Sequence, residues 1–185
     1  MTYFEELVNT RIMHSENMAA TISSKALDIR KESIKRSLSN YETVGHRQEY
    51  VTTIDGVMYF DDAKAETVNA TWFTMENAVK PIIWIASGRD KNNDFTELLP
   101  LVKQNVKALI CLDDKTEYLK KAFAQSITDI YSARNIEEAV KMASILAQEG
   151  EIVLFSPTCK SSKRSETFNE RGNQFRNSVM QIENA

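Results

Sequence analysis

Beyond Gln48 the chain alternates between two patterns of apolar residues. Short continuous runs, such as Val57–Phe60 and Pro81–Ala86, have the length and the β-branched or aromatic content of strands. Between these runs, apolar residues recur every three or four positions, as on the buried face of an amphipathic helix. Strands that alternate with such helices favour a parallel sheet covered on both faces. The pattern therefore predicts an α/β fold: a Rossmann-like, mostly parallel sheet with helices on both faces.

The expected elements follow one another in regular order. Asp55-Gly56 stands between two strand-like runs and predicts a hairpin, because glycine accepts the positive φ of a two-residue turn. This hairpin adds an antiparallel edge to the sheet. Strands are expected at Tyr50–Ile54, Val57–Phe60, Pro81–Ala86, Ala108–Leu112, Ile127–Tyr131 and Glu151–Phe155. Helices are expected along Val68, Trp72, Met75 and Val79, and at Phe95–Val102, Thr116–Ala124, Ile136–Gln148 and Glu166–Ile182.

The first forty-five residues show a different pattern. Two short helices are expected at Ser15–Ile29 and Lys31–Asn40, and Gly45 ends this helical pair. So short a segment supplies little core of its own. We therefore predict that residues 1–45 are a helical appendage, or the tail of a domain whose larger part is missing, and that residues 46–185 form one domain.

Charge, hydropathy and cysteine content narrow the classes of function. The 23 basic and 26 acidic residues give a net charge of −3, so no nucleic-acid partner is expected. The longest apolar runs have only five residues, so no membrane partner is expected, and without a secretion signal the location is expected to be cytoplasmic. Cys111 and Cys159 have no second Cys or His at metal-ligand spacing, so no metal site is expected.

The loops that follow the strands carry the candidate chemistry. In a parallel sheet these loops open on one rim, where ligands bind in this class of fold. Asp61, Asp62 and Lys64 follow one strand, and residues 160–176 after the last strand hold five basic residues against two acidic ones. This local excess suits an anionic ligand. The alternative is that these are solvated loops, and that Asp61, Asp62 and Glu66 only begin a helix.

Familiar catalytic motifs are missing from the sequence. It contains no phosphate-binding G-x-x-x-x-G-K-[ST] loop, no G-x-G-x-x-G fingerprint and no nucleophile elbow. His14 and His46 lie outside the predicted strand–helix core, and neither has a partner at a readable spacing. The residues alone thus indicate an anion-binding rim without a self-contained catalytic apparatus.

Four segments on this rim resemble the C-terminal domain of the Mur ligases, most closely the branch that adds D-glutamate. They match family motifs before the first strand, at the first strand-to-helix junction, after the next strand and at the entry to the last helix. In this chain they stand at Gly45–Glu49, Asp61–Thr67, Ser87–Phe95 and Ser156–Phe175. His14–Ala20 is similar to the helix that closes the family's central ATPase domain, so residues 1–45 would be the tail of that missing domain.

The resemblance implies a role for several residues. The family couples ATP cleavage, with Mg²⁺, to amide-bond formation between UDP-N-acetylmuramoyl-L-alanine and D-glutamate in peptidoglycan synthesis. Arg47 and Asp62 would reach the nucleotide. D-glutamate would be bound by Lys64, Lys91, Ser161 and Phe168. The chain lacks the phosphate loop, the Mg²⁺ ligands and the UDP-binding domain, so we expect no catalytic residue in this fragment alone, no tightly bound cofactor and no turnover without the missing N-terminal and central domains.

The chain also departs from the family motifs. Ala63 stands where the motif has Ser, Glu66 where it has Thr, and Lys163 where it has Asp. A carboxylate at Glu66 lies within one turn of Lys64, where it would neutralise the ammonium group and repel glutamate. The alternative hypothesis is therefore a non-catalytic relic or binding module that keeps the Mur-ligase fold without the glutamate site.

Overall fold

The computed structural model describes residues 45–87, 93–112, 116–161 and 165–183. All of them belong to Thr43–Ala185, the second of two units into which the chain divides. The two helices predicted before Gly45 lie outside the described residues. The domain boundary after residue 45 stays a prediction.

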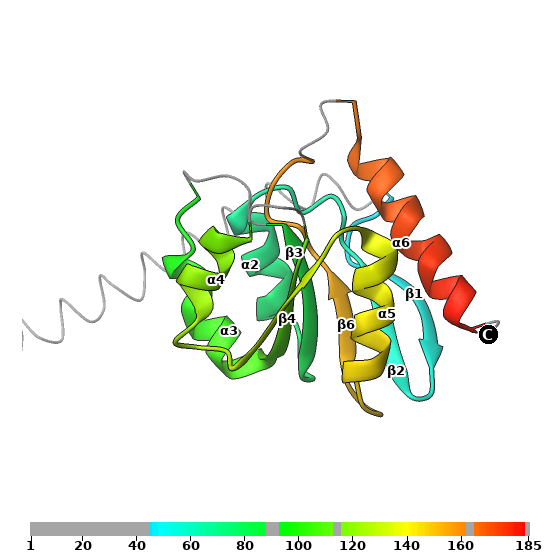
Figure 1. The fold of residues 1–185 in the computed structure, drawn as a ribbon, viewed down its shortest axis with the longest axis horizontal. Coiled ribbons are helices and arrows are strands. Elements are labelled where there is room, and N and C mark those ends of the chain that lie inside the picture. Colours follow the sequence, from blue (N-terminus) through cyan, green and yellow to red (C-terminus); the bar gives the residue numbers. More distant parts are fainter. Residues whose placement is uncertain (1–44, 88–92, 113–115, 162–164, 184–185) are drawn as a thin grey trace, which may run out of the picture. The chain divides into compact units, whose positions relative to one another are not determined.

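A six-stranded sheet forms the centre of this unit (Figure 1). Its strand order is β1-β2-β6-β3-β4-β5, in which β1 runs antiparallel to β2 and every other neighbouring pair is parallel. The strands are β1 (Glu49–Ile54), β2 (Val57–Asp61), β3 (Ile82–Ser87), β4 (Val106–Leu112), β5 (Asp129–Ala133) and β6 (Ile152–Phe155). The mostly parallel sheet with an antiparallel edge hairpin is thus confirmed.

The β1–β2 hairpin turns at the predicted dipeptide. Asp55 has φ 49° and Gly56 has φ 75°, so both turn residues lie in the left-handed region that a two-residue turn of this kind needs. Ile54 and Val57 pair directly across the turn. The hairpin places Asp61 at the end of β2, beside Phe155 of β6.

Helices cover both faces of the sheet, as predicted (Figure 1). Residues of α5 and α6 pack in one hydrophobic core, and residues of α2, α3 and α4 pack in a second core on the other face. The helices are α2 (Val68–Glu76), the 3-10 turn η1 (Thr96–Leu98), α3 (Leu99–Asn105), α4 (Glu117–Phe123), α5 (Ile136–Leu146) and α6 (Phe168–Glu183). No helix among the described residues is long and apolar enough to cross a membrane.

Strand β3 joins the two cores because its side chains alternate between them. Ile83 and Ile85 belong to the core under α5 and α6, whereas Trp84 belongs to the core under α2, α3 and α4. The Trp84 indole N–H donates to the carbonyl oxygen of Ser156 at 2.9 Å, which satisfies its buried donor. A strand buried on both faces is continuously apolar in sequence, and for this reason β3 was recognisable.

Some predicted elements have other bounds in the structure. Val79 was expected on the buried face of a helix, but α2 ends at Glu76 and Val79 is 92% exposed. The Asn77 side chain donates to the carbonyl of Phe73 at this end, and Pro81 follows shortly afterwards. The strand expected at Ile127–Tyr131 is β5 two residues later, because the Ile127 N–H is used in closing α4 on the carbonyl of Phe123.

Candidate functional site

Three loops meet at the rim formed by the carboxyl ends of β2, β3 and β6. Thr158, in the loop after β6, is central to their connection. Its N–H donates to the carbonyl of Ala65 at 2.9 Å, and its hydroxyl donates to the carbonyl of Ser87 at 2.7 Å. Loops far apart in the sequence are therefore held together, as the predicted parallel topology requires.

The end of β2 buries two neighbouring carboxylates. Asp61 and Asp62 are 0% and 1% exposed. The Asp62 N–H still donates to Phe155 at 2.8 Å, so the extended backbone continues past the strand end. Successive side chains of an extended chain leave in opposite directions. The two carboxylates accordingly have different partners.

Asp61 lies in a charged cluster that joins β2 to α6. Its Oδ2 is 2.5 Å from Nδ1 of His46 and accepts a hydrogen bond from Nε of Arg176 at 2.9 Å. Arg176 also forms an ion pair with Glu49, whose carboxylate accepts the His46 N–H at 2.9 Å. The cluster fixes the segment before β1 against α6.

The structure contradicts the prediction that His46 lies outside the core without a partner. His46 is 8% exposed and pairs with Asp61, fifteen residues along the chain. Its φ of 63° lies in the left-handed region, which is uncommon for a residue other than glycine. A Cβ on Gly172 would overlap the imidazole ring, so α6 approaches His46 closely because residue 172 is glycine. A glycine inside a predicted helix was the one sequence signal of this close approach.

Asp62 is bound by neutral donors instead. Its Oδ2 accepts hydrogen bonds from the hydroxyls of Thr74 at 2.6 Å and Ser156 at 3.0 Å, and its Oδ1 accepts the N–H of Gln48 at 3.2 Å. Burial raises the pKa of Asp62 to about 7, although these hydrogen bonds and the charge of Arg47 act to lower it. Arg47 and Asp62, both predicted to reach a nucleotide, thus interact electrostatically.

Two of the predicted glutamate-binding residues lie against each other. The Lys64 ammonium group is 3.6 Å from the centroid of the Phe168 ring, a cation–π contact between the loop after β2 and the start of α6. The Lys64 N–H donates to the carbonyl of His46 at 3.0 Å, and the His46 and Phe168 rings meet edge to face. This contact joins residues that are 104 positions apart.

Of the other two predicted glutamate-binding residues, the structure describes Ser161 alone. Ser161 lies in the loop before α6, where its hydroxyl donates to the carboxylate of Glu166. Lys91 lies outside the described residues. Convergence of all four residues on one pocket therefore stays a prediction.

Glu66, the departure closest to Lys64, has a partner of its own. Its Oε1 accepts a hydrogen bond from Nη2 of Arg171 at 3.0 Å. Nη1 of Arg171 donates to the carbonyl of Cys159 at 3.2 Å, so the guanidinium group of α6 binds the loops after both β2 and β6. Arg171 had no individual predicted role.

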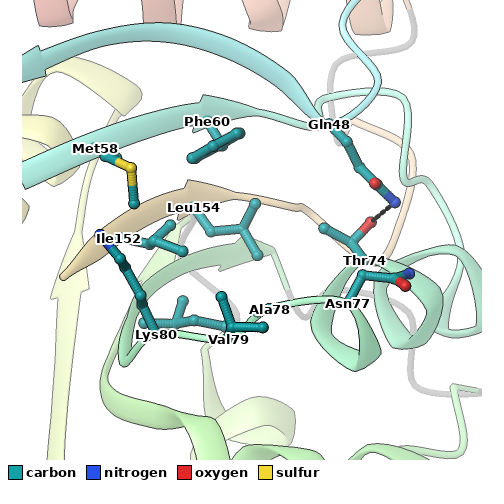
Figure 2. A pocket seen from close by; sticks show the side chains of 11 residues that line it. Gln48, Met58, Phe60, Thr74, Asn77, Ala78, Val79, Lys80, Ile152 and Leu154 are labelled. Atoms are coloured by element: carbon teal, nitrogen blue, oxygen red, sulfur yellow. Dashed lines mark hydrogen bonds between the residues drawn. The ribbon is translucent and has the colours of Figure 1, made fainter. Parts of the chain in front are cut away.

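A groove of about 280 Å³ opens on the face of the sheet that α2 partly covers. In Figure 2, Met58, Phe60, Ile152 and Leu154 line it from the strands, and the hydrogen bond between Gln48 and Thr74 closes one end. Its lining is mainly apolar and does not include Lys64, Ser161 or Phe168. This groove therefore has the wrong chemistry for a dicarboxylic ligand. No cluster of three His, Cys, Asp or Glu residues within the described ranges is placed to hold a metal ion.

Comparison with known proteins agrees with this architecture. Residues 46–159 match the family model described as Mur ligase, glutamate ligase domain. A UDP-N-acetylmuramoylalanine–D-glutamate ligase from Salinibacter ruber is 40% identical over 163 residues, which are 88% of this chain and 35% of that protein. The ligase of the same name from Porphyromonas gingivalis is 38% identical over 180 residues, 96% of this chain and 40% of the relative. This chain thus spans little more than a third of the length of these relatives.

Solved structures with low sequence identity show the same fold. UDP-N-acetylmuramate–alanine ligase from Thermotoga maritima aligns with a TM-score of 0.51 at 10% identity, over 78% of this chain and 36% of that chain. A domain of a ligase from Haemophilus ducreyi aligns with a TM-score of 0.50 at 14% identity, over 72% of this chain and 99% of that chain. The family model covers more than half of the residues, and the fold agrees with it. The chain belongs to the Mur ligase family and carries its glutamate ligase domain.

Proposed function

We propose that this chain is the amino-acid-binding domain of a cytoplasmic, ATP-dependent ligase that joins D-glutamate to UDP-N-acetylmuramoyl-L-alanine during peptidoglycan synthesis. The observation that carries the proposal is the Lys64 ammonium group, held over Phe168 at the rim of the sheet. It is supported by relatives that are named for D-glutamate ligation.

The rim suits a small dicarboxylic substrate. Lys64 is partly exposed, so its ammonium group can leave the Phe168 ring for a carboxylate at modest cost. In the proposed complex Lys64 and Lys91 each bind one carboxylate of D-glutamate, while Ser161 and Phe168 line the pocket. Fixed charges of this kind place the amino group of the substrate for attack and lower the barrier mainly by positioning and electrostatics.

The segment before β1 suits the nucleotide. Arg47 is partly exposed beside Asp62, and a guanidinium group there can bind phosphate oxygens. Asp62 already accepts three hydrogen bonds and is 1% exposed, so a nucleotide reaches it only if the segment around Gln48 moves. ATP with Mg²⁺ would supply the phosphoryl group that activates the acceptor carboxylate. This chain would supply Arg47 to hold the phosphates, and until that movement Asp62 would position the segment that carries Arg47 through its hydrogen bond from the Gln48 N–H.

The domain is not expected to turn over alone, because it spans 35–40% of the length of its relatives. The second candidate is a binding module that no longer recognises glutamate. It is favoured by Ser161, whose hydroxyl donates to Glu166, a carboxylate of the same loop. The two candidates differ in whether the rim selects D-glutamate.

An amide-resolved NMR titration with D-glutamate, with L-glutamate as control, tests the proposal. We expect saturable shifts at Lys64, Ser161 and Phe168 that favour the D isomer and disappear in Lys64→Ala. The matched control is Lys141→Ala, because Lys141 lies on α5 in an exposed pair with Glu137. Shifts that are equal for the two isomers, or that survive Lys64→Ala, would contradict the proposal.

A further inference from the structure

Glu66 introduces a negative charge into the loop that carries Lys64, the residue on which binding of the proposed substrate depends. It lies two residues after Lys64 in the loop between β2 and α2. Its side chain is 20% exposed, so water screens the carboxylate only in part. An unpaired carboxylate at this place would oppose any anionic ligand of Lys64.

Arg171 of α6 offsets this charge. Its side chain is 4% exposed, and Nη2 donates to Oε1 of Glu66 at 3.0 Å. Nη1 is bound to the carbonyl of Cys159, and Nε is buried without a hydrogen-bond partner among the described residues. A guanidinium group so deeply buried needs an anion nearby, because burial of an unpaired charge is strongly unfavourable. Glu66 and Arg171 therefore each supply the charge that the other requires.

We propose that Arg171 determines specificity as a positioning residue: it pairs with Glu66, cancels the negative charge beside Lys64 and so keeps the rim attractive to an anionic amino acid. The ligand, D-glutamate, rests on the proposed function, whereas the pairing rests on the geometry. Arg171 itself does not contact the substrate in this proposal. Its bond to the Cys159 carbonyl also holds the loop that leads to Ser161.

Rescue by a second substitution is the diagnostic test. Arg171→Met should weaken D-glutamate binding at least tenfold in the NMR titration, because Glu66 is then unpaired. The double variant Arg171→Met, Glu66→Gln should recover most of the affinity, since both charges are gone. If Arg171 instead bound the substrate directly, the double variant would stay as weak as Arg171→Met, and the proposal would be overturned.

Inorganic sulfate separates this inference from the proposed function. Sulfate lacks the shape of glutamate, but its binding depends on the charge around Lys64. The chemical-shift changes that sulfate causes at the Lys64 amide should therefore become smaller in Arg171→Met and return in the double variant. If sulfate follows this pattern while D-glutamate does not bind, the proposed function fails and the inference stands. If sulfate shifts are the same in all variants, the inference fails.

If Arg171→Met is too unstable for the titrations, a double-mutant cycle measured by denaturation tests the pairing instead. The unfolding equilibria of the wild type, Glu66→Gln, Arg171→Met and the double variant should show at least tenfold coupling between the two sites. The control pair is Arg134 and Glu138, which are also joined at 3.0 Å but with Arg134 87% exposed. Their variants should leave sulfate and D-glutamate binding unchanged and show little coupling. Additive effects at Glu66 and Arg171 would overturn the pairing.

Discussion

Asp61 and Asp62, at the end of β2, carry the same buried carboxylate but have different kinds of hydrogen-bond partner. On the α6 side, the Asp61 carboxylate faces the guanidinium group of Arg176 and the imidazole of His46. On the α2 side, the equally buried Asp62 accepts hydrogen bonds from two hydroxyls and one backbone N–H. Burial is almost identical at the two residues, so it does not by itself decide how a carboxylate behaves. The hydrogen-bond partners differ: a guanidinium group donates to Asp61, whereas, among the described residues, every hydrogen bond to the Asp62 carboxylate comes from a neutral group.

The largest effect is expected from the pH dependence of Asp62. Its pKa is raised to about 7 in the folded state, so between about pH 4 and pH 7 the folded state holds a proton that the unfolded state has lost. Wild-type stability should therefore fall as pH rises through this window. Asp62→Asn removes this loss, so its free energy of unfolding relative to wild type should rise by about 3 kcal/mol from pH 4 to pH 8.

Urea denaturation at several pH values measures this difference. The control is Asp94→Asn, because a hydrogen bond from Thr96 lowers the pKa of Asp94. Asp94 is ionised in both the folded and the unfolded state between about pH 5 and pH 8. The difference in free energy of unfolding between Asp94→Asn and wild type should therefore not change with pH in this range. A flat difference for Asp62→Asn as well would mean that burial does not raise the pKa of Asp62.

The next largest effect is expected at Asp61. Asp61→Asn keeps the shape of the side chain but leaves Arg176 and His46 without their carboxylate. We expect a loss of about 2 kcal/mol in the free energy of unfolding, less than for a fully buried pair because Arg176 is 31% exposed and still contacts Glu49. Chemical denaturation at pH 7 measures it, and Glu138→Gln at the exposed pair on α5 provides a control with little expected change. If Asp61→Asn loses no more free energy of unfolding than Glu138→Gln does, the charged contacts of Asp61 do not stabilise the fold.

The smallest effect is expected at Gly172, where α6 meets the Asp61 cluster. Gly172→Ala places a Cβ in the imidazole ring of His46, which its bond to Asp61 holds in place. Overpacking should exceed the helix propensity that alanine adds, giving a net loss of about 1 kcal/mol in the free energy of unfolding. In the control Gly45→Ala the nearest atom is 3.9 Å from the new Cβ, so thermal denaturation should show almost no change. A rise in melting temperature for Gly172→Ala would show that His46 is free to move.

The sequence predicted those parts of the fold that local patterns determine. The helix expected at Ile136–Gln148 begins as α5 at Ile136, where the side chain of the neighbouring Asn135 accepts the N–H of Glu138 at 2.8 Å. The Asp55-Gly56 turn is equally local. In contrast, the end of α2 before Val79 and the start of β5 depend on tertiary context, which a periodic pattern does not contain.

The site was predictable only where a family motif supplied the long-range information. The contact between Lys64 and Phe168 joins two motifs named by resemblance. The bond between Arg176 and Asp61 spans 115 positions, and the bond between Arg171 and Glu66 spans 105 positions. Nothing local in the sequence links these partners, so the pairing of His46 with Asp61 and of Arg171 with Glu66 was not predicted.

Trp84 is placed to report on Asp62 through its fluorescence. Its indole N–H is bonded to the carbonyl of Ser156, the residue whose hydroxyl donates to Asp62. Indole emission responds to the electric field at the ring, so loss of the Asp62 proton should change the colour or yield of Trp84 fluorescence without any added label. We therefore expect the chain to report the ionisation of Asp62 through its own fluorescence.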